Sequence, residues 1–173
     1  RHLSEIIEQI SLLGADYFEC QLPIFITDKM GAFYESRMKR CLGLEAKSWK
    51  SFQGNYYDID IDVLKEQLAI IKDKHKRKFK LNPDLKDENL DLYFKAPESI
   101  YPERRCTLPF TQIHLEPNGN VVVCPDFPDC IVGNIYQSDL DEIWNSENNI
   151  KFREMIKQQS LSICSRCCQF YQF

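Results

Sequence analysis

Residues 106–124 read CTLPFTQIHLEPNGNVVVC, and this stretch decides how the second part of the chain folds. Polar and apolar side chains alternate over 110–116, which predicts a half-buried β-strand. The Asn-Gly pair at 118–119 is a strong signal for a hairpin with a type I′ turn, because both central residues of that turn need positive φ. The hairpin is therefore expected to bring Cys106 and Cys124 towards the same end.

Two further cysteines, Cys164 and Cys167, follow far along the chain. A Cys-x-x-Cys pair can bind one metal centre, because the intervening turn lets both sulfurs point inward. Four soft ligands from three places in the sequence predict one tetrahedral sulfur site, which suits zinc or an iron–sulfur cluster. Cys130 and Cys168 stay unassigned, and either could replace one of the four. Cys130 could instead be a buried apolar side chain.

The segment between these cysteines is expected to contain a turn and two short helices. Gly133-Asn134-Ile135 is expected to turn the chain. Ser138 is expected to begin a short helix through a capping box that Asp141 completes. Ser146 should cap the next helix, which leads to the Cys-x-x-Cys pair.

The composition excludes several classes of protein. At 173 residues with 43% hydrophobic content, the chain is long enough for one domain, or for one domain plus a small satellite. Its 22 Lys and Arg residues are outnumbered by 26 Asp and Glu, so the net charge of −4 gives no reason to expect a nucleic-acid partner. No apolar stretch approaches the roughly 20 residues of a membrane span, so no membrane partner is expected.

The eight cysteines are more naturally interpreted as ligands than as disulfides, because the chain shows no secretory signal. We therefore expect a cytoplasmic protein and rank a disulfide-stabilised secreted protein last. Cys20 and Cys41 stand alone in the sequence and are expected to be buried or incidental thiols. Because the chain begins at Arg1 rather than Met, we also expect a fragment of a longer protein.

Residues 1–96 alternate between helix and strand. Apolar spacing and end signals predict helices over 3–13, 30–42, 86–94 and from Asp60 onward, with strands over 16–22 and 79–81. This order predicts an α/β fold with a parallel sheet. Two or three parallel strands alone would leave exposed edges, so we expect part of a larger barrel or sheet. Prolines near residue 97 predict the boundary to a second domain, 97–173.

The order of motifs in the second domain resembles the C-terminal auxiliary-cluster region of radical S-adenosylmethionine (radical SAM) enzymes, the SPASM and twitch group. The resemblance covers residues 100–173 and is carried by Cys106…Gly119…Cys124, Gly133-Asn134-Ile135, Leu140-Asp141-Glu142-Ile143-Trp144-Asn145-Ser146, Phe152-Arg153 and Cys164-x-x-Cys167. It implies that residues 1–96 are the closing β/α units of a partial (β/α) barrel. A small domain of a β-hairpin and helices would follow.

The resemblance also implies a cofactor and a substrate. Carried over residue by residue, the four cysteines at 106, 124, 164 and 167 would bind one auxiliary [4Fe–4S] cluster. Only Cys168 remains beyond the last pair, so the one-cluster twitch form is expected rather than the two-cluster SPASM form. Such a cluster could bind a small-molecule or peptide substrate, or accept an electron from a substrate radical.

One departure from the family limits what the chain could do. Radical SAM enzymes carry a Cys-x-x-x-Cys-x-x-Cys loop that holds the cluster for cleaving S-adenosylmethionine, and these 173 residues contain no such spacing. We therefore expect the chain alone to be inactive. An N-terminal radical SAM half, in the same or another chain, would supply S-adenosylmethionine and a second [4Fe–4S] cluster. The alternative is a structural or interaction module in which the same thiolates hold zinc without catalysis.

Four other residues are weaker candidates for a site. His114 is most simply a cross-strand polar residue of the hairpin, and a ligand or proton donor is the less favoured interpretation. Glu19 and Gln21 near the end of the first strand, with Asn82 at the end of the second, lie where β/α barrels place groups that contact substrate.

Overall fold

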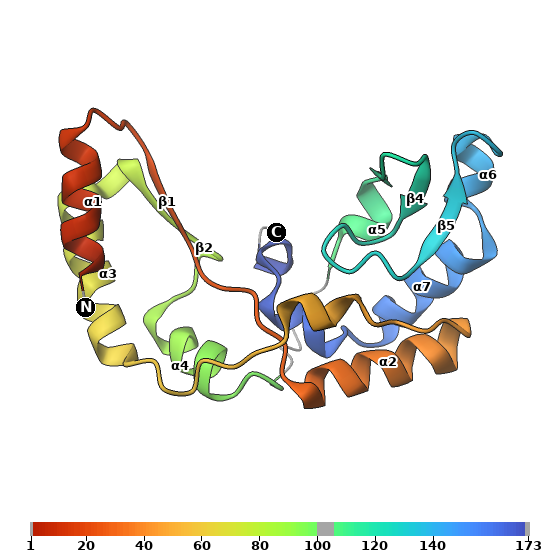
Figure 1. Cartoon of the computed structure of the whole chain (residues 1–173), viewed down its shortest axis with the longest axis horizontal. Coiled ribbons are helices and arrows are strands. Elements are labelled where there is room, and N and C mark those ends of the chain that lie inside the picture. The colour runs from red at the N-terminus through yellow and green to blue at the C-terminus, as the bar shows by residue number, and fades with distance from the viewer. Residues whose placement is uncertain (1, 100–105, 172–173) are drawn as a thin grey trace.

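The computed structural model describes residues 2–99 and 106–171, and its elements form an open crescent (Figure 1). One arm holds the elements of residues 3–21 and 61–82, and the other holds the small sheet of residues 114–134. The C-terminal end of the chain lies between the two arms (Figure 1).

The first arm is built around two parallel strands. Its elements are α1 (Leu3–Leu12), β1 (Phe18–Gln21), α3 (Ile61–His75), η2 (Lys76–Lys78) and β2 (Phe79–Asn82). β1 pairs with β2 so that Phe18 lies opposite Phe79 and Gln21 lies opposite Asn82. The predicted mixed α/β class is confirmed, and the described residues contain two small sheets and no closed barrel. That the parallel pair belongs to a partial barrel stays a prediction.

The remaining elements of the first half connect the arms. They are α2 (Asp28–Leu42), η1 (Ser48–Phe52) and α4 (Asp87–Lys95). The predicted cap of α3 is confirmed, because the Asp60 carboxylate accepts a hydrogen bond from the Val63 N–H at 3.1 Å. α2 ends at Gly43, whose φ of 71° lies in the left-handed region that favours glycine.

The second arm carries a three-stranded antiparallel sheet. It consists of α5 (Leu108–Thr111), β3 (His114–Leu115), β4 (Asn120–Val122) and β5 (Ile131–Asn134), with strand order β3-β4-β5. The prediction of a strand over 110–116 was wrong in its first half, because Phe110 and Thr111 end the short helix α5. Pro109 lies in the first turn of that helix, where its fixed φ favours helix and its missing N–H has no helical partner to lose.

The hairpin between β3 and β4 is confirmed, but its turn is not type I′. The Gly119 N–H donates to the Glu116 carbonyl at 2.9 Å, and the Glu116 N–H donates to the Asn120 carbonyl at 2.9 Å. Gly119 has a φ of 85°, whereas Asn118 does not have positive φ. This is the geometry of a three-residue loop closed by a bulge glycine, and Pro117 suits its first turn position because its φ is already fixed.

The last elements are α6 (Leu140–Trp144), α7 (Glu147–Gln158), η3 (Ser162–Arg166) and η4 (Cys168–Tyr171). Gly133 and Asn134 belong to β5, so the predicted turn at Gly133-Asn134-Ile135 was placed too early. Gly133 is needed for close packing instead, because an added Cβ would lie 2.7 Å from Cγ1 of Ile143.

The two predicted helix starts in this region had different outcomes. Asp139, rather than Ser138, caps α6, and its carboxylate accepts a hydrogen bond from the Glu142 N–H at 2.8 Å. Ser146 does occupy the cap position of α7, as predicted, although its hydroxyl makes no capping hydrogen bond. The cap of α6 was therefore predicted one residue too early, and that of α7 correctly.

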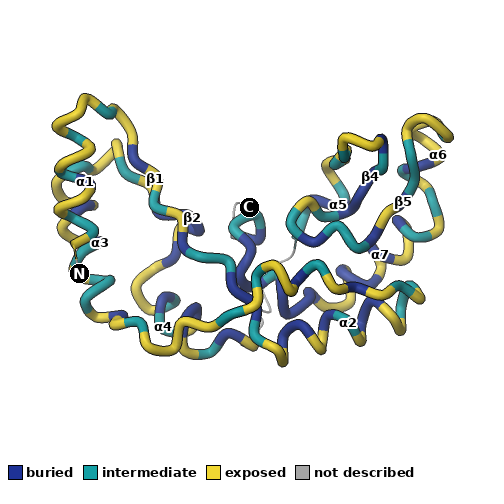
Figure 2. Tube along the Cα trace, viewed as in Figure 1, coloured by how far each residue is buried: buried dark blue, intermediate teal, exposed yellow. Residues whose placement is uncertain are grey.

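The larger hydrophobic core joins the first half of the chain to the second. Met30, Tyr34 and Met38 of α2 pack in one cluster with Val121 of β4 and Ile156 of α7. Buried residues follow α2 and α7 along the base of the second arm (Figure 2). The predicted domain boundary near residue 97 stays a prediction. None of the helices in the described part of the chain combines the length and apolar character of a membrane span.

Gly31 of α2 provides a test of this packing. The indole of Trp49 lies against it, and an added Cβ would be 2.3 Å from Cε2 of Trp49. We expect Gly31→Ala to lower the free energy of unfolding by about 1–3 kcal/mol through overpacking, although alanine favours a helix by about 1 kcal/mol over glycine. Urea unfolding measures the change. Gly54→Ala is the control, because an added Cβ there meets no atom within 4 Å. A Gly31→Ala protein as stable as the wild type would contradict this packing.

Candidate metal centre

Three separate segments bring the four cysteines predicted as ligands into one neighbourhood. Cys106 precedes α5, Cys124 follows β4, and Cys164 and Cys167 lie in and directly after η3. The pKa of Cys164 is raised well above its ordinary value, first by burial and then by the nearby Cys106 and Cys124. Besides burial and Asp126, Cys164 and Cys124 also raise the pKa of Cys167. The thiols are thus close enough for their charges to affect one another.

Burial keeps these thiols protonated in the absence of a bound cation. It raises the pKa of Cys124 to about 12 and also raises the pKa of Cys106. All eight cysteines are free thiols. A cation that replaced the protons would meet soft sulfur donors already sheltered from water, which is the donor set that zinc and iron–sulfur clusters prefer.

Backbone N–H groups support the charged form of all four sulfurs. The N–H of Leu108 bonds to Cys106 and that of Phe127 bonds to Cys124. The N–H of Leu161 bonds to Cys164 and that of Gln169 bonds to Cys167. Each of these hydrogen bonds lowers the pKa of its cysteine and so opposes the larger effect of burial. Because N–H···S bonds stabilise a thiolate, they fit sulfurs that bind a positive centre.

The side chains are not arranged around a single ion. Among residues 2–99 and 106–171, no three Cys, His, Asp or Glu side chains are grouped in a way that could hold one metal ion.

Asp126 lies among the cysteines and was missed in the sequence. The Cys167 thiol donates a hydrogen bond to Oδ2 of Asp126, with a sulfur–oxygen distance of 3.4 Å. The negative charge of Asp126 also contributes to the raised pKa of the thiols at Cys106, Cys124 and Cys164. Its position two residues after Cys124 is the only signal that the sequence offers.

Asp129 holds the loop between Cys124 and Cys130 against the first half of the chain. Its Oδ1 accepts hydrogen bonds from the N–H groups of Lys47 and Ser48, at 2.9 and 3.1 Å. Its Oδ2 accepts the Tyr34 hydroxyl at 2.9 Å and the Ser48 hydroxyl. The pKa of Tyr34 is raised by burial and then by this carboxylate. The loop that follows Cys124 is therefore fixed to α2 and η1.

Arg166 fixes the Cys-x-x-Cys turn to α4. It is fully buried and donates hydrogen bonds to the carbonyls of Ala96 at 3.2 Å and Leu92 at 3.4 Å, at the end of that helix. Its guanidinium stacks 4.7 Å from the ring centre of Tyr93 and 5.5 Å from that of Phe25. A cation at a helix C-terminus is favourable, because the helix dipole is negative there.

The other cysteines occupy different surroundings. Cys130 is fully buried in the larger core, and burial followed by the charge of Asp129 raises its pKa to about 12. Cys168 is half-buried in η4, where its sulfur accepts a hydrogen bond from Gln169 at 4.0 Å. Cys20 is half-buried in β1, and Cys41 is half-buried in α2, where it packs against the larger core.

The weaker candidates of the sequence lie in two places. His114 pairs across the hairpin with Val122, and burial lowers its pKa, although the charge of Asp126 opposes this effect in part. Asn82 donates a hydrogen bond to Oε1 of Glu19 at 2.7 Å, and Gln21 lies opposite Asn82 in the parallel pair. The three strand residues therefore do meet at one end of the β1–β2 sheet.

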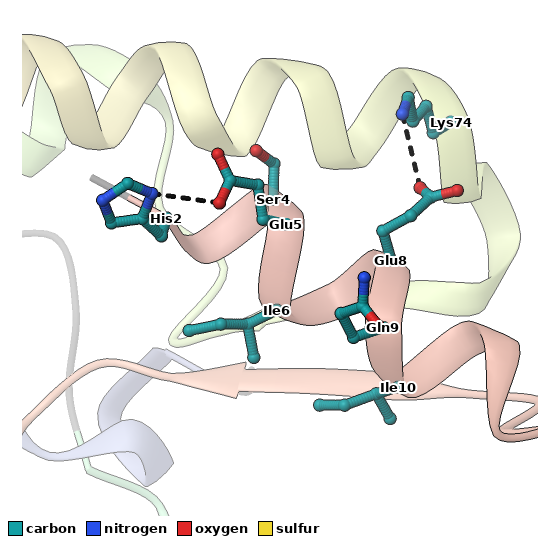
Figure 3. A pocket seen from close by; sticks show the side chains of 8 residues that line it. All are labelled: His2, Ser4, Glu5, Ile6, Glu8, Gln9, Ile10 and Lys74. Atoms are coloured by element: carbon teal, nitrogen blue, oxygen red, sulfur yellow. Dashed lines mark hydrogen bonds and ion pairs between the residues drawn. The ribbon is translucent and has the colours of Figure 1, made fainter.

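Two open pockets in the described part of the chain are lined by residues other than cysteine. One of about 500 Å³ runs along α1, where His2 bonds to Glu5 and Lys74 bonds to Glu8 (Figure 3). Another of about 330 Å³ lies between the start of α2 and residues 53–57. Neither pocket contains a cysteine.

Comparisons with known proteins bear on the cysteine segment alone. No curated protein and no solved structure matches the chain. A family model does match residues 106–168, and its description is SPASM, an iron–sulfur cluster-binding domain. The resemblance found in the sequence is thereby confirmed: residues 106–168 match the SPASM iron–sulfur cluster-binding domain, which is consistent with a SPASM-type domain of a radical SAM enzyme.

Proposed function

We propose that this chain is part of a radical SAM enzyme and binds one auxiliary [4Fe–4S] cluster through Cys106, Cys124, Cys164 and Cys167. The observation that carries the proposal is the meeting of these four thiols, from three segments, inside the residues that match the SPASM domain. Four cysteines supply one ligand for each iron of such a cluster.

The residues around the cysteines prepare the site in three ways. Burial shields the sulfurs in part from water, and the N–H groups of Leu108, Phe127 and Gln169 donate hydrogen bonds to three of them. Asp129 and Arg166 hold the two cysteine-bearing loops on separate helices of the first half. A bound cluster would supply a one-electron redox centre, and the chain's own residues would orient and shelter it.

The proposed reaction needs more than these 173 residues. Their sequence contains no Cys-x-x-x-Cys-x-x-Cys loop, so we assign binding of S-adenosylmethionine and of a second [4Fe–4S] cluster to an N-terminal radical SAM half, in the same or another chain. The parallel β1–β2 pair has only two strands, and its open edges suit the addition of further parallel strands from that half. The substrate is proposed to be a small molecule or a peptide, and the location cytoplasmic.

Metal analysis separates this proposal from a structural zinc site. The chain is purified anaerobically, reconstituted with iron and sulfide, and assayed for iron, sulfide, zinc and visible absorption. We expect about four iron and four sulfide per chain, with a broad charge-transfer band. A colourless protein that holds one zinc per chain would overturn the cluster proposal and support the Cys₄ zinc module.

Replacing single cysteines tests the ligand assignment. Cys164→Ser exchanges a soft sulfur for a hard oxygen donor at a half-buried position, so we expect the reconstituted protein to hold less than about half of the wild-type iron. Cys41→Ser, in α2, is the matched control and should retain the wild-type content. Circular dichroism of both variants before reconstitution checks that they are folded. Equal iron in the two folded variants would refute Cys164 as a ligand.

Cluster binding should also stabilise the folded chain. A group that binds only the folded state raises the unfolding temperature. If its dissociation constant lies well below the working concentration, we expect a rise of about 5–10 °C for a chain of this size. Thermal unfolding of the reconstituted and the metal-free chain, both kept anaerobic, measures this rise. Cys164→Ser should show the same unfolding temperature with and without iron and sulfide. A wild-type chain that loads iron but gains no thermal stability would show that the iron is not held by the folded site.

A further inference from the structure

Among the residues that the structure describes, Asp126 is the one carboxylate whose charge acts on all four proposed ligands. After the larger effect of burial, it helps to raise the pKa of every one of these thiols. Its Oδ2 is also the hydrogen-bond acceptor of the Cys167 thiol, at 3.4 Å. The residue is half-buried, in the loop that Cys124 begins. Its negative charge is therefore partly screened by water but lies beside the sulfurs.

The contact with Cys167 places the negative charge of Asp126 beside the proposed cluster. A cubane bound by four thiolates is already anionic, and reduction adds one more electron to it. Two like charges a few ångströms apart repel strongly inside a protein, because the surroundings screen them less than water does. The net charge around an iron–sulfur cluster is one of the factors that set its reduction potential. Asp126 is thus placed to oppose reduction.

We propose that Asp126 lowers the reduction potential of the cluster held by the four cysteines, and that it does so by its charge, without binding iron. This inference rests on the proposed function, since it needs a bound cluster. The four cysteines already provide one ligand for each iron, so the carboxylate is left as a neighbour of Cys167. The chemical consequence is that the bound group gives up an electron more readily than the same group beside an amide.

Asp126→Asn tests this charge with little change of shape. The wild type and the variant are reconstituted anaerobically and titrated with dithionite in the presence of redox mediators, which deliver one electron per cluster with no bond made or broken. At a fixed solution potential, we expect about a tenfold higher ratio of reduced to oxidised cluster in the variant, equal to about 59 mV for a one-electron couple. Visible absorption and electron paramagnetic resonance measure the ratio.

Three further variants separate charge from packing. Asp126→Glu keeps the charge and should stay within about twofold of the wild-type ratio. Asp126→Ala removes the charge with a different shape and should shift the ratio in the same direction as the asparagine variant. Glu154→Gln removes one charge from an exposed position of α7, where solvent screens it, and should leave the ratio within about twofold of wild type.

The outcomes distinguish this inference from the proposed function. If the wild type binds no cluster, both fail together. If Asp126→Asn loads the wild-type amount of iron but its ratio stays within twofold of wild type, the charge effect alone is refuted. If Asp126→Asn loads less than half of the wild-type iron while Asp126→Glu loads normally, the carboxylate is needed to hold iron, and its role beside the cluster is refuted.

Discussion

Four desolvated thiols have to be held in place by the backbone around them, because a thiol makes only weak hydrogen bonds of its own. Here the positioning is done by two polar side chains next to the cysteines. Asp129 ties the loop after Cys124 to η1 and α2 through four hydrogen bonds, and Arg166 ties the turn between Cys164 and Cys167 to the end of α4.

Both ties end on the first half of the chain, so the cysteine site depends on residues outside the SPASM-type segment. The larger core also joins the first half to the SPASM-type segment, since α2 packs with β4 and α7. Arg166 lies over aromatic rings that belong to the other core, next to α4. The first half therefore acts as the scaffold on which the cysteine-bearing loops are fixed, whatever strands are added to β1 and β2.

Local signals in the sequence predicted what local interactions decide. The cap at Asp60, the strands at 18–21 and 79–82 and the hairpin at Gly119 each depend on a few neighbouring residues, and each was found. The turn type was wrong because Pro117 and Gly119 together favour a bulge over a type I′ turn. The roles of Asp126, Asp129 and Arg166 could not be predicted, because the partners that define them lie 41 to 95 residues away and no periodicity marks them. The ligand role of the cysteines stays a prediction.

The two aspartates of one loop illustrate how position and charge can be divided between neighbours. The Asp129 carboxylate accepts hydrogen bonds from the first half, so its charge is balanced by the donors of Lys47, Ser48 and Tyr34. Asp126 receives a hydrogen bond from Cys167, and that donor would be lost once the thiol gave up its proton to bind iron. The charge of Asp126 would then face an anionic group without this compensation. The hydrogen bonds of Asp129 anchor the same loop, so they oppose any movement that would take Asp126 away from the cluster and weaken the repulsion.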